Sequence, residues 1–107
     1  MNIYRKFKAW LQLRDAVRQA DKAHGESGDR FFVLPAAGGK LIVTDRRNFR
    51  ILKRKHYIDK SKTVADMERG CFYATPGKGG TGAISAGSRM KYFYKWKERF
   101  YERRKAQ

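Results

Sequence analysis

The chain has 107 residues, the length of one domain, and at that size about two thirds of the unfolded surface can be buried. Hydrophobic residues make up 41% of the chain and aromatic residues 14%, which excludes a disordered polycation. Lys and Arg number 26 against 10 Asp and Glu, a formal charge of +16, so the expected partner is anionic: nucleic acid, an acidic protein or an anionic membrane.

Cysteine usage and hydropathy exclude further classes. Cys71 is the only cysteine, so neither an intrachain disulfide nor a cysteine cluster for zinc is possible. No segment approaches the roughly 20 apolar residues of a membrane span, and the N-terminal residues lack the apolar run of a secretory signal. We expect one cytosolic domain over residues 1–107.

The first predicted element is a long amphipathic helix from Ile3 to about Ala23. At 100° per residue its apolar residues fall on one side, which we expect to pack on the core. These residues are Ile3, Phe7, Trp10, Leu11, Leu13, Val17 and Ala20. The helix should end before Gly25 and the polar run "HGESGD".

A β-hairpin is predicted next. Its strands are the apolar runs "RFFVLP", at 30–35, and "KLIVT", at 40–44. Between them "AAGG" provides two glycines, which can adopt the positive φ that a tight reversal needs.

The stretch "VTDRRNFRILKRKHY" predicts a basic helix from Arg46 to about His56. Thr44 or Asp45 can cap it, because a short side-chain oxygen accepts a hydrogen bond from the first free backbone amides. On the helical wheel one edge, within about 60°, is suited to packing. That edge holds Phe49, Leu52 and His56.

The other flank of this helix carries the main functional signal. Arginine binds phosphate in two-point geometry, and a helix is narrow enough to enter the DNA major groove. The predicted nucleic-acid-binding residues are Arg46, Arg47, Arg50, Lys53, Arg54 and Lys55. The alternative interpretation is a solvated basic face that binds nothing.

A short helix, a third strand and a long helix complete the prediction. "TVAD", at 63–66, has the spacing of a capping box, and Gly70 can end the helix it opens. "CFYATP", at 71–76, is a strand candidate, and the glycine-rich tract at 77–88 is predicted to be a flexible loop. The last segment is a helix whose aromatic stripe we expect in the core. Its stripe consists of Met90, Tyr92, Phe93, Trp96 and Phe100.

The expected fold is therefore an α+β domain, a small three-stranded antiparallel sheet covered by amphipathic helices in the order α-β-β-α-α-β-α. Residues 103–107 would extend beyond it as a basic tail. Secondary phosphate contacts are predicted at Lys78, Arg103, Arg104 and Lys105. Lys78 lies among glycines whose amides can converge on an anion, although the loop lacks the Walker pattern.

No catalytic or metal-binding signature is present. His24 and His56 have no cysteine or carboxylate at ligand spacing. Cys71 opens an apolar strand, which predicts a buried, inert thiol. The few carboxylates lie in caps or among cations and form no acid–base pair. We therefore expect a protein that is not an enzyme and uses no metal or cofactor.

The segments "FFVLP", "GKLIVTDRRNFRILKRKHYI" and "CFYATP", in this order, resemble small uncharacterised basic proteins of bacteriophages and mobile elements. The resemblance runs from about Arg30 to Pro76 and assigns no role to any residue. It implies a protein that is associated with a virion or with genome handling, in the virion or in the cytoplasm of a bacterial host.

Three functions are compatible with these features. The leading hypothesis is largely sequence-independent binding of DNA or RNA. The second is a structural or assembly adaptor that docks on an acidic protein partner, because Trp10, Trp96 and several tyrosines exceed the needs of so small a core. The third is peripheral membrane binding through Phe7 and Trp10, which Asp15 and Asp21 on the same helix disfavour.

Overall fold

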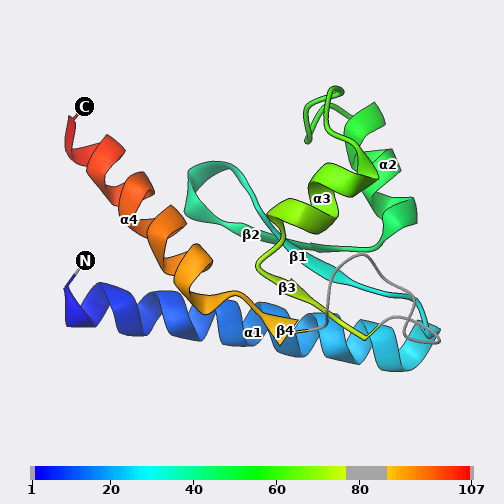
Figure 1. The fold of residues 1–107 in the computed structure, drawn as a ribbon, viewed down its shortest axis with the longest axis horizontal. Helices are drawn as coiled ribbons and strands as arrows, with labels where there is room; N and C mark the ends of the chain where they lie inside the picture. The colour runs from blue at the N-terminus through cyan, green and yellow to red at the C-terminus, as the bar shows by residue number, and fades with distance from the viewer. Residues whose placement is uncertain (1, 77–86, 107) are drawn as a thin grey trace.

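The computed structural model describes residues 2–76 and 87–106, with side chains as far as Arg103, and this part of the chain combines helices with one antiparallel sheet (Figure 1). In chain order the elements are α1 (Ile3–Ser27), β1 (Phe32–Pro35), the 3₁₀ turn η1 (Ala37–Gly39), β2 (Leu41–Thr44), α2 (Arg46–Arg54), α3 (Val64–Gly70), β3 (Tyr73–Ala74), β4 (Gly87–Ser88) and α4 (Met90–Ala106). The predicted α+β class is confirmed.

The sheet has four strands in the order β2-β1-β3-β4, so the prediction of three strands was wrong. Strand β1 lies inside the sheet. It pairs antiparallel with β2, where Phe32 is opposite Thr44, and with β3, where Val33 is opposite Tyr73. Strand β4 pairs with β3 over two residues, Gly87 and Ser88. Neither residue is hydrophobic, so the sequence shows no alternation of apolar and polar residues there.

The additional strand occupies the end of the glycine-rich tract at 77–88, which was predicted to be a flexible loop. Residues 77–86, and with them Lys78, lie outside the described residues. Backbone hydrogen bonds hold the described end of the tract: the amide of Arg89 donates to the carbonyl of Phe72 at 2.7 Å. A strand of two residues forms only through its pairing with the neighbouring strand, so the local sequence does not predict it.

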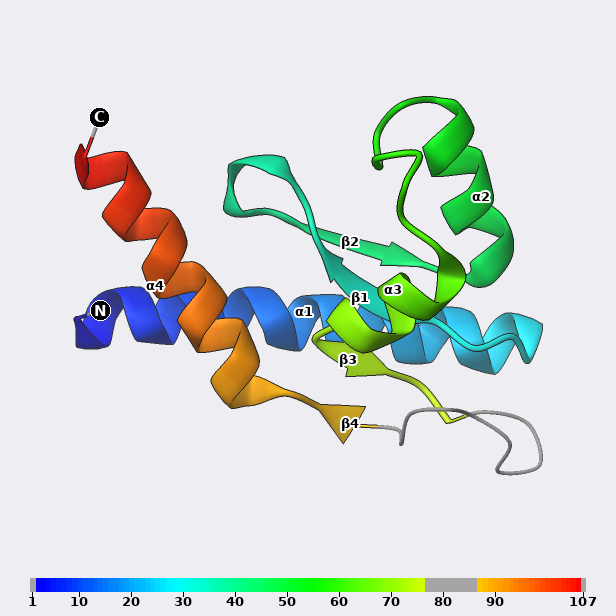
Figure 2. The same cartoon turned by 45° about the horizontal axis from the view of Figure 1, so that its top comes forward.

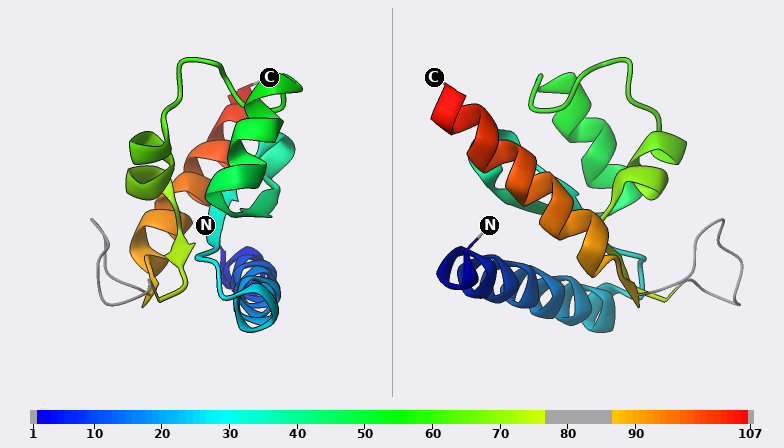
Figure 3. Two further views of the ribbon diagram at one scale, coloured as in Figure 1. Left: turned by 90° about the vertical axis from the view of Figure 1, so that its right-hand side faces the viewer. Right: turned by 60° about the vertical axis from the view of Figure 1, so that its left-hand side comes forward.

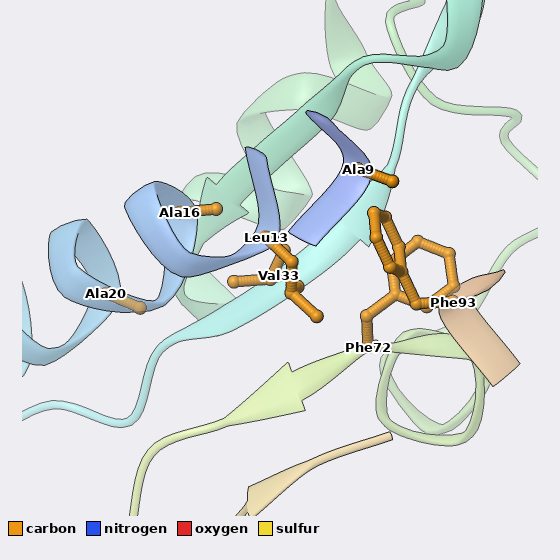
Figure 4. Close-up of a cluster of buried hydrophobic side chains, with 7 residues drawn as sticks. All are labelled: Ala9, Leu13, Ala16, Ala20, Val33, Phe72 and Phe93. Atoms are coloured by element: carbon orange, nitrogen blue, oxygen red, sulfur yellow. The ribbon is translucent and has the colours of Figure 1, made fainter. Parts of the chain in front are cut away.

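Helices cover the sheet on both faces, and β1 is buried on both. Val33 points to the face covered by α1 and α4, whereas Phe32 and Leu34 point to the face covered by α2 and α3. The first core cluster, drawn in Figure 4, contains Ala9, Leu13, Ala16, Ala20, Val33, Phe72 and Phe93. The second contains Phe32, Leu34, Phe49, Met67, Cys71 and Ala74. Helices α1 and α2 therefore lie on opposite sides of the sheet (Figures 1 and 2).

Helix α1 packs through three alanines and Leu13, so the predicted apolar side is confirmed for Leu13 and Ala20. The buried positions are Ala9, Leu13, Ala16 and Ala20. Ile3, Phe7 and Trp10 are exposed, so their predicted place in the core was wrong. They lie about 120° around the helix from the alanine row. Alanine contributes little to a hydrophobicity pattern, but it lets a helix backbone approach a sheet closely.

The predicted end of α1 before Gly25 was also wrong, because the helix continues to Ser27. Gly28 follows in the left-handed region, at φ 76°, and its amide donates to the carbonyl of His24 at 2.8 Å. A glycine is tolerated inside a helix at a cost of about 1 kcal/mol, whereas the left-handed cap position specifically favours it. Gly28, and not Gly25, therefore ends the helix.

The predicted hairpin is confirmed, with η1 at its tip. Gly38 and Gly39 both have φ 73°, as the positive-φ requirement predicted. A Cβ atom on Gly39 would lie 2.9 Å from the Phe100 ring, so helix α4 also needs a glycine there. The capping box of α3 is confirmed: Thr63 and Asp66 each accept a hydrogen bond from the other's backbone amide.

Helix α4 packs on the same face of the sheet as α1 and is inclined to it (Figure 3). Phe93 is fully buried, and its ring centroid lies 5.2 Å from that of Phe72, as expected for the aromatic stripe. Tyr92 departs from that expectation and is exposed. The helix continues to Ala106, through most of the range predicted as a basic tail.

Candidate nucleic-acid interface

Helix α2 is fixed to the domain at its first residue and at one buried side chain. The carboxylate of Asp45 accepts a hydrogen bond from the amide of Asn48 at 2.7 Å, which caps the helix as predicted. Phe49 is 2% exposed and packs in the second core cluster against residues of β1 and α3. The two anchors hold the opposite flank of the helix toward solvent.

Four cations on or beside that flank are exposed and form no ion pair with any described residue. They are Arg47, Arg50, Arg54 and Lys55. Lys53 is half-buried, with its ammonium 5.9 Å from the centre of the Phe49 ring. At 100° per residue Arg47, Arg50 and Arg54 span about 60° of the helix surface, so their guanidinium groups face one side.

Arg46 differs from the other arginines of α2 because it has a carboxylate partner. Its guanidinium donates to Glu68 at 2.6 Å, and Glu68 on α3 is 7% exposed. A buried carboxylate needs a partner, since an unpaired buried charge is strongly destabilising. Arg46 therefore joins α2 to α3, and its charge is already largely compensated.

The end of α2 is a Schellman motif with histidine in the left-handed position. His56 has φ 65° and its amide donates to Lys53, while the amide of Tyr57 donates to Leu52 at 3.0 Å. His56 is exposed, so its predicted place on the packed edge was wrong. The helix stops at Arg54, before the turn that would have brought His56 beside Phe49.

Two carboxylates lie near α2 without neutralising its arginines. Hydrogen bonds from the backbone and hydroxyl of Ser61 lower the pKa of Asp59. The backbone amide of Thr63, with the guanidinium of Arg69, lowers the pKa of Asp66 to about 2. Both carboxylates are therefore ionised at neutral pH and have their own partners in the α2–α3 segment.

A cavity of about 390 Å³ lies beside these carboxylates, on the Phe49 side of α2. Apolar side chains from β1, α2 and α3 line much of it, including Leu34, Phe49 and Met67. Asp59 and Asp66 also line it. Lys62 lies at this cavity too, but the apolar lining and the two carboxylates do not suit phosphate, so the basic surface consists of the exposed cations outside the cavity interior.

Of the predicted secondary phosphate contacts, Arg103 is described with its side chain, and the fold does not bring it to α2. Arg103 is exposed on the C-terminal end of α4, at the opposite end of the molecule from α2 (Figure 1). The side chains of Arg104 and Lys105, and the whole of Lys78, lie outside the described residues. The candidate surface in the described part of the chain is therefore α2 itself with the adjoining exposed lysines, Lys60 and Lys62.

Sequence reasoning missed two buried charged residues that shape the domain. Glu68 received no role, although it positions Arg46. Lys97 is 7% exposed and donates to the carbonyl of Gly39 at 2.7 Å. Burial lowers the pKa of Lys97. A signal existed for Lys97: it lies four residues after Phe93, which puts both on one side of α4.

The sequence also made predictions for the Cys71 thiol and for metal-binding side chains. Cys71 is buried, as predicted, and its thiol donates to the carbonyl of Glu68 at 3.2 Å. Burial raises the pKa of that thiol. Within residues 2–76 and 87–106 no group of His, Cys, Asp or Glu side chains is arranged to hold a metal ion. No helix in this range is long and apolar enough to cross a membrane.

Comparison with known proteins found no family model, curated protein or solved structure that matches the chain. A functional assignment therefore depends on the chemistry of the surfaces described above.

Proposed function

We propose that the protein binds nucleic acid, DNA or RNA, through contacts between the phosphates and helix α2. The observation that carries this proposal is the set of exposed arginines Arg47, Arg50 and Arg54, which have no carboxylate partner among the described residues. Guanidinium groups in this state retain all their donors for phosphate oxygens. The remaining positive charge of the chain adds a long-range attraction for the same polymer.

The geometry of α2 favours binding that is largely independent of sequence. Nine helical residues extend about 13 Å, which corresponds to roughly four base steps along one strand. Asn48, the residue whose side chain is suited to reading adenine, lies about 100° away from Arg47 around the helix. Its side chain and the arginines therefore do not face the same surface, and the main contacts are expected with phosphates.

The test is the salt dependence of binding to a mixed-sequence oligonucleotide. We expect the triple variant Arg47→Gln/Arg50→Gln/Arg54→Gln to reduce the slope of log affinity against log salt by about two to three, because each lost phosphate contact removes about 0.9 for duplex DNA or about 0.7 for a single strand. Arg46 is left intact, since its removal would leave Glu68 buried without its partner. Fluorescence anisotropy at several salt concentrations gives the slope.

A matched control separates the helix from net charge. Lys91→Gln/Lys95→Gln/Arg99→Gln removes three exposed cations from α4 and lowers the charge of the chain by the same amount. The control should keep most of the slope. Equal slopes for the two triple variants would show that α2 is not the binding surface.

The nature of the partner is tested separately by purification. If α2 binds nucleic acid, the material that elutes with the protein at low salt absorbs strongly at 260 nm and is lost after nuclease treatment. An acidic protein that remains bound in stoichiometric amount after nuclease, and that requires Arg47, Arg50 and Arg54, would replace the proposal with the adaptor function. We extend the proposal to genome handling or virion association in a bacteriophage or mobile element.

A further inference from the structure

The N-terminal half of α1 exposes an apolar ridge that the core does not use. Ile3 is 86% exposed, Tyr4 63%, Phe7 56% and Trp10 39%. At 100° per residue these four side chains span about 120° of the helix surface, on the side away from the alanine row that packs on the sheet. We refer to these four residues as the α1 ridge.

The rings of the α1 ridge contact neighbouring side chains of the same helix. Phe7 stacks on Trp10 with centroids 6.1 Å apart, and the guanidinium of Arg14 lies 5.3 Å from the Trp10 centroid. Phe7 precedes Trp10 by about one turn and Arg14 follows it by about one turn, so the indole has a contact from each direction along the helix. The Lys8 ammonium lies 4.6 Å from the centroid of Tyr4.

This arrangement bears on the kind of partner. Bases of single-stranded nucleic acid bind to aromatic side chains by stacking on open ring faces. The Trp10 ring already contacts Phe7 and Arg14, and Ile3, the most exposed member, has no ring. Ile3 and the aromatic side chains beside it instead suit insertion among lipid acyl chains and headgroups, where Trp and Tyr are enriched.

Cations flank the ridge, so the ridge favours a partner of negative charge. Lys6 and Lys8 lie on either side of it, each about 100° from the centre of the arc, and Arg14 continues it toward the C-terminus. The Lys6 ammonium lies 5.2 Å from the Tyr94 centroid, and the Arg5 guanidinium lies 4.7 Å from that of Tyr101, so α4 holds this end of α1 in place. Long basic side chains beside an apolar ridge can place their charges among anionic headgroups.

A second copy of the chain fits the ridge poorly. Docking two ridges face to face would bring together two sets of Lys6, Lys8 and Arg14, on chains that each carry +16. The first turn of α1 contains no acidic residue that could compensate them. Asp15, the nearest carboxylate along the helix, is already paired with Arg14 at 3.4 Å.

We propose that the α1 ridge binds the surface of an anionic lipid membrane, with Ile3, Phe7 and Trp10 inserted and the flanking cations at the headgroups. Helix α1 then lies along the interface and does not cross the bilayer. Helix α1, which carries the ridge, and helix α2 lie on opposite sides of the sheet (Figure 2), so membrane and nucleic acid can be bound at the same time. This inference does not depend on the proposed function of α2.

Vesicle flotation of the nuclease-treated full chain tests the inference. We expect the protein to float with phosphatidylcholine vesicles that contain about 30% phosphatidylserine and to remain at the bottom with phosphatidylcholine alone. Ile3→Gln/Phe7→Gln should lower partitioning about tenfold to a hundredfold, because two apolar side chains no longer insert. Both positions are exposed, so circular dichroism should show an unchanged fold.

Two controls distinguish insertion from general attraction of charge. Tyr57→Gln replaces an aromatic side chain that is 73% exposed beyond the end of α2 and should leave flotation unchanged. The Arg47→Gln/Arg50→Gln/Arg54→Gln variant should also float, even though it binds nucleic acid weakly. Flotation that survives Ile3→Gln/Phe7→Gln, or that is lost equally with Tyr57→Gln, would overturn the inference.

A spectroscopic measurement on the unmodified protein, with a conservative aromatic replacement as its control, tests insertion of Trp10 directly. Lipids with brominated acyl chains should quench tryptophan emission of the unmodified protein, and Trp10→Phe should abolish that quenching while Trp96 still emits. Quenching that persists in Trp10→Phe would contradict insertion of the ridge. Absence of flotation by the unmodified protein, or ridge-dependent binding of an acidic protein in place of vesicles, would also overturn it.

Discussion

Lys97 is a buried cation that donates to the carbonyl of Gly39, lies 5.6 Å from the centre of the Trp96 ring and forms no ion pair with any described residue. Burial favours the neutral amine, which is why its pKa is lowered. Gln12 also donates to the carbonyl of Gly39, at 3.1 Å, so this acceptor keeps one partner without the lysine. The ammonium therefore opposes folding at neutral pH more than its hydrogen bond supports it.

We expect Lys97→Met to raise the free energy of unfolding by about 1 kcal/mol, the low end of the gain when buried ionic groups are replaced by apolar residues of similar volume. The pH dependence follows from the lowered pKa. The unfolded chain binds the proton more tightly, so wild-type stability rises as pH increases through the folded pKa toward 10.5. The advantage of the methionine should therefore be largest at neutral pH and shrink above it.

Urea denaturation at several pH values measures both effects. Lys95→Met, at an exposed position of the same helix, is the matched control and should change stability by less than about 0.5 kcal/mol. A clear loss of stability in Lys97→Met at neutral pH would show that the bond to Gly39 outweighs the burial of the charge.

At the scale of elements, local signals were reliable where one residue decides the backbone conformation. The capping residues Asp45 and Thr63 and the hairpin glycines are examples, because their effect acts within a few residues. The packed side of α1 was predicted only in part: Leu13 and Ala20 are buried, whereas the N-terminal apolar residues are exposed. An alanine row and a bulky ridge both recur at helical spacing, and the sheet selects the former because small side chains permit close packing.

The C-terminal end of α2 gives a prediction at the same scale. His56 adopts φ 65°, a left-handed conformation that costs an L-residue with a Cβ about 1 kcal/mol. His56→Gly removes this strain while keeping the Schellman hydrogen bonds, so we expect the free energy of unfolding to rise by about 0.5–1 kcal/mol. Urea denaturation measures it.

Lys55→Gly provides the comparison for that substitution. Lys55 has φ −87°, which any residue adopts, so a glycine there should destabilise the protein through the entropy of the unfolded chain. Because His56 is not among the phosphate-binding residues, His56→Gly should also leave the salt slope of nucleic-acid binding unchanged. A stability loss in His56→Gly would mean that the imidazole makes a compensating contact.

At the scale of the whole molecule, the basic helix was predictable and its partners were not. The sequence places five cations in α2 and a sixth, Lys55, at its C-cap, but the ion pair between Arg46 and Glu68 joins residues from two helices. No periodicity links them, because the contact depends on how α2 and α3 pack on one face of the sheet. The same limit applies to the α1 ridge, which the sequence could not distinguish from core.

The excess of positive charge lowers the thermal stability of the complete domain at low salt. A charge of +16 on a chain this small gives self-repulsion that salt screens. We expect the melting temperature to rise by about 5 °C between about 20 mM and about 300 mM NaCl, corresponding to roughly 1 kcal/mol for a domain of this size. Differential scanning fluorimetry measures it.

The arginine variants show whether self-repulsion is the cause. Arg47→Gln/Arg50→Gln/Arg54→Gln lowers the net charge by three at positions with no ion pair among the described residues, so it should melt higher than the wild type at low salt and respond less to added salt. A melting temperature that falls in both proteins as salt is added would show that self-repulsion is not the dominant effect. Screening would then weaken attractive pairs, such as Arg46–Glu68 and Arg69–Asp66, more than it relieves repulsion.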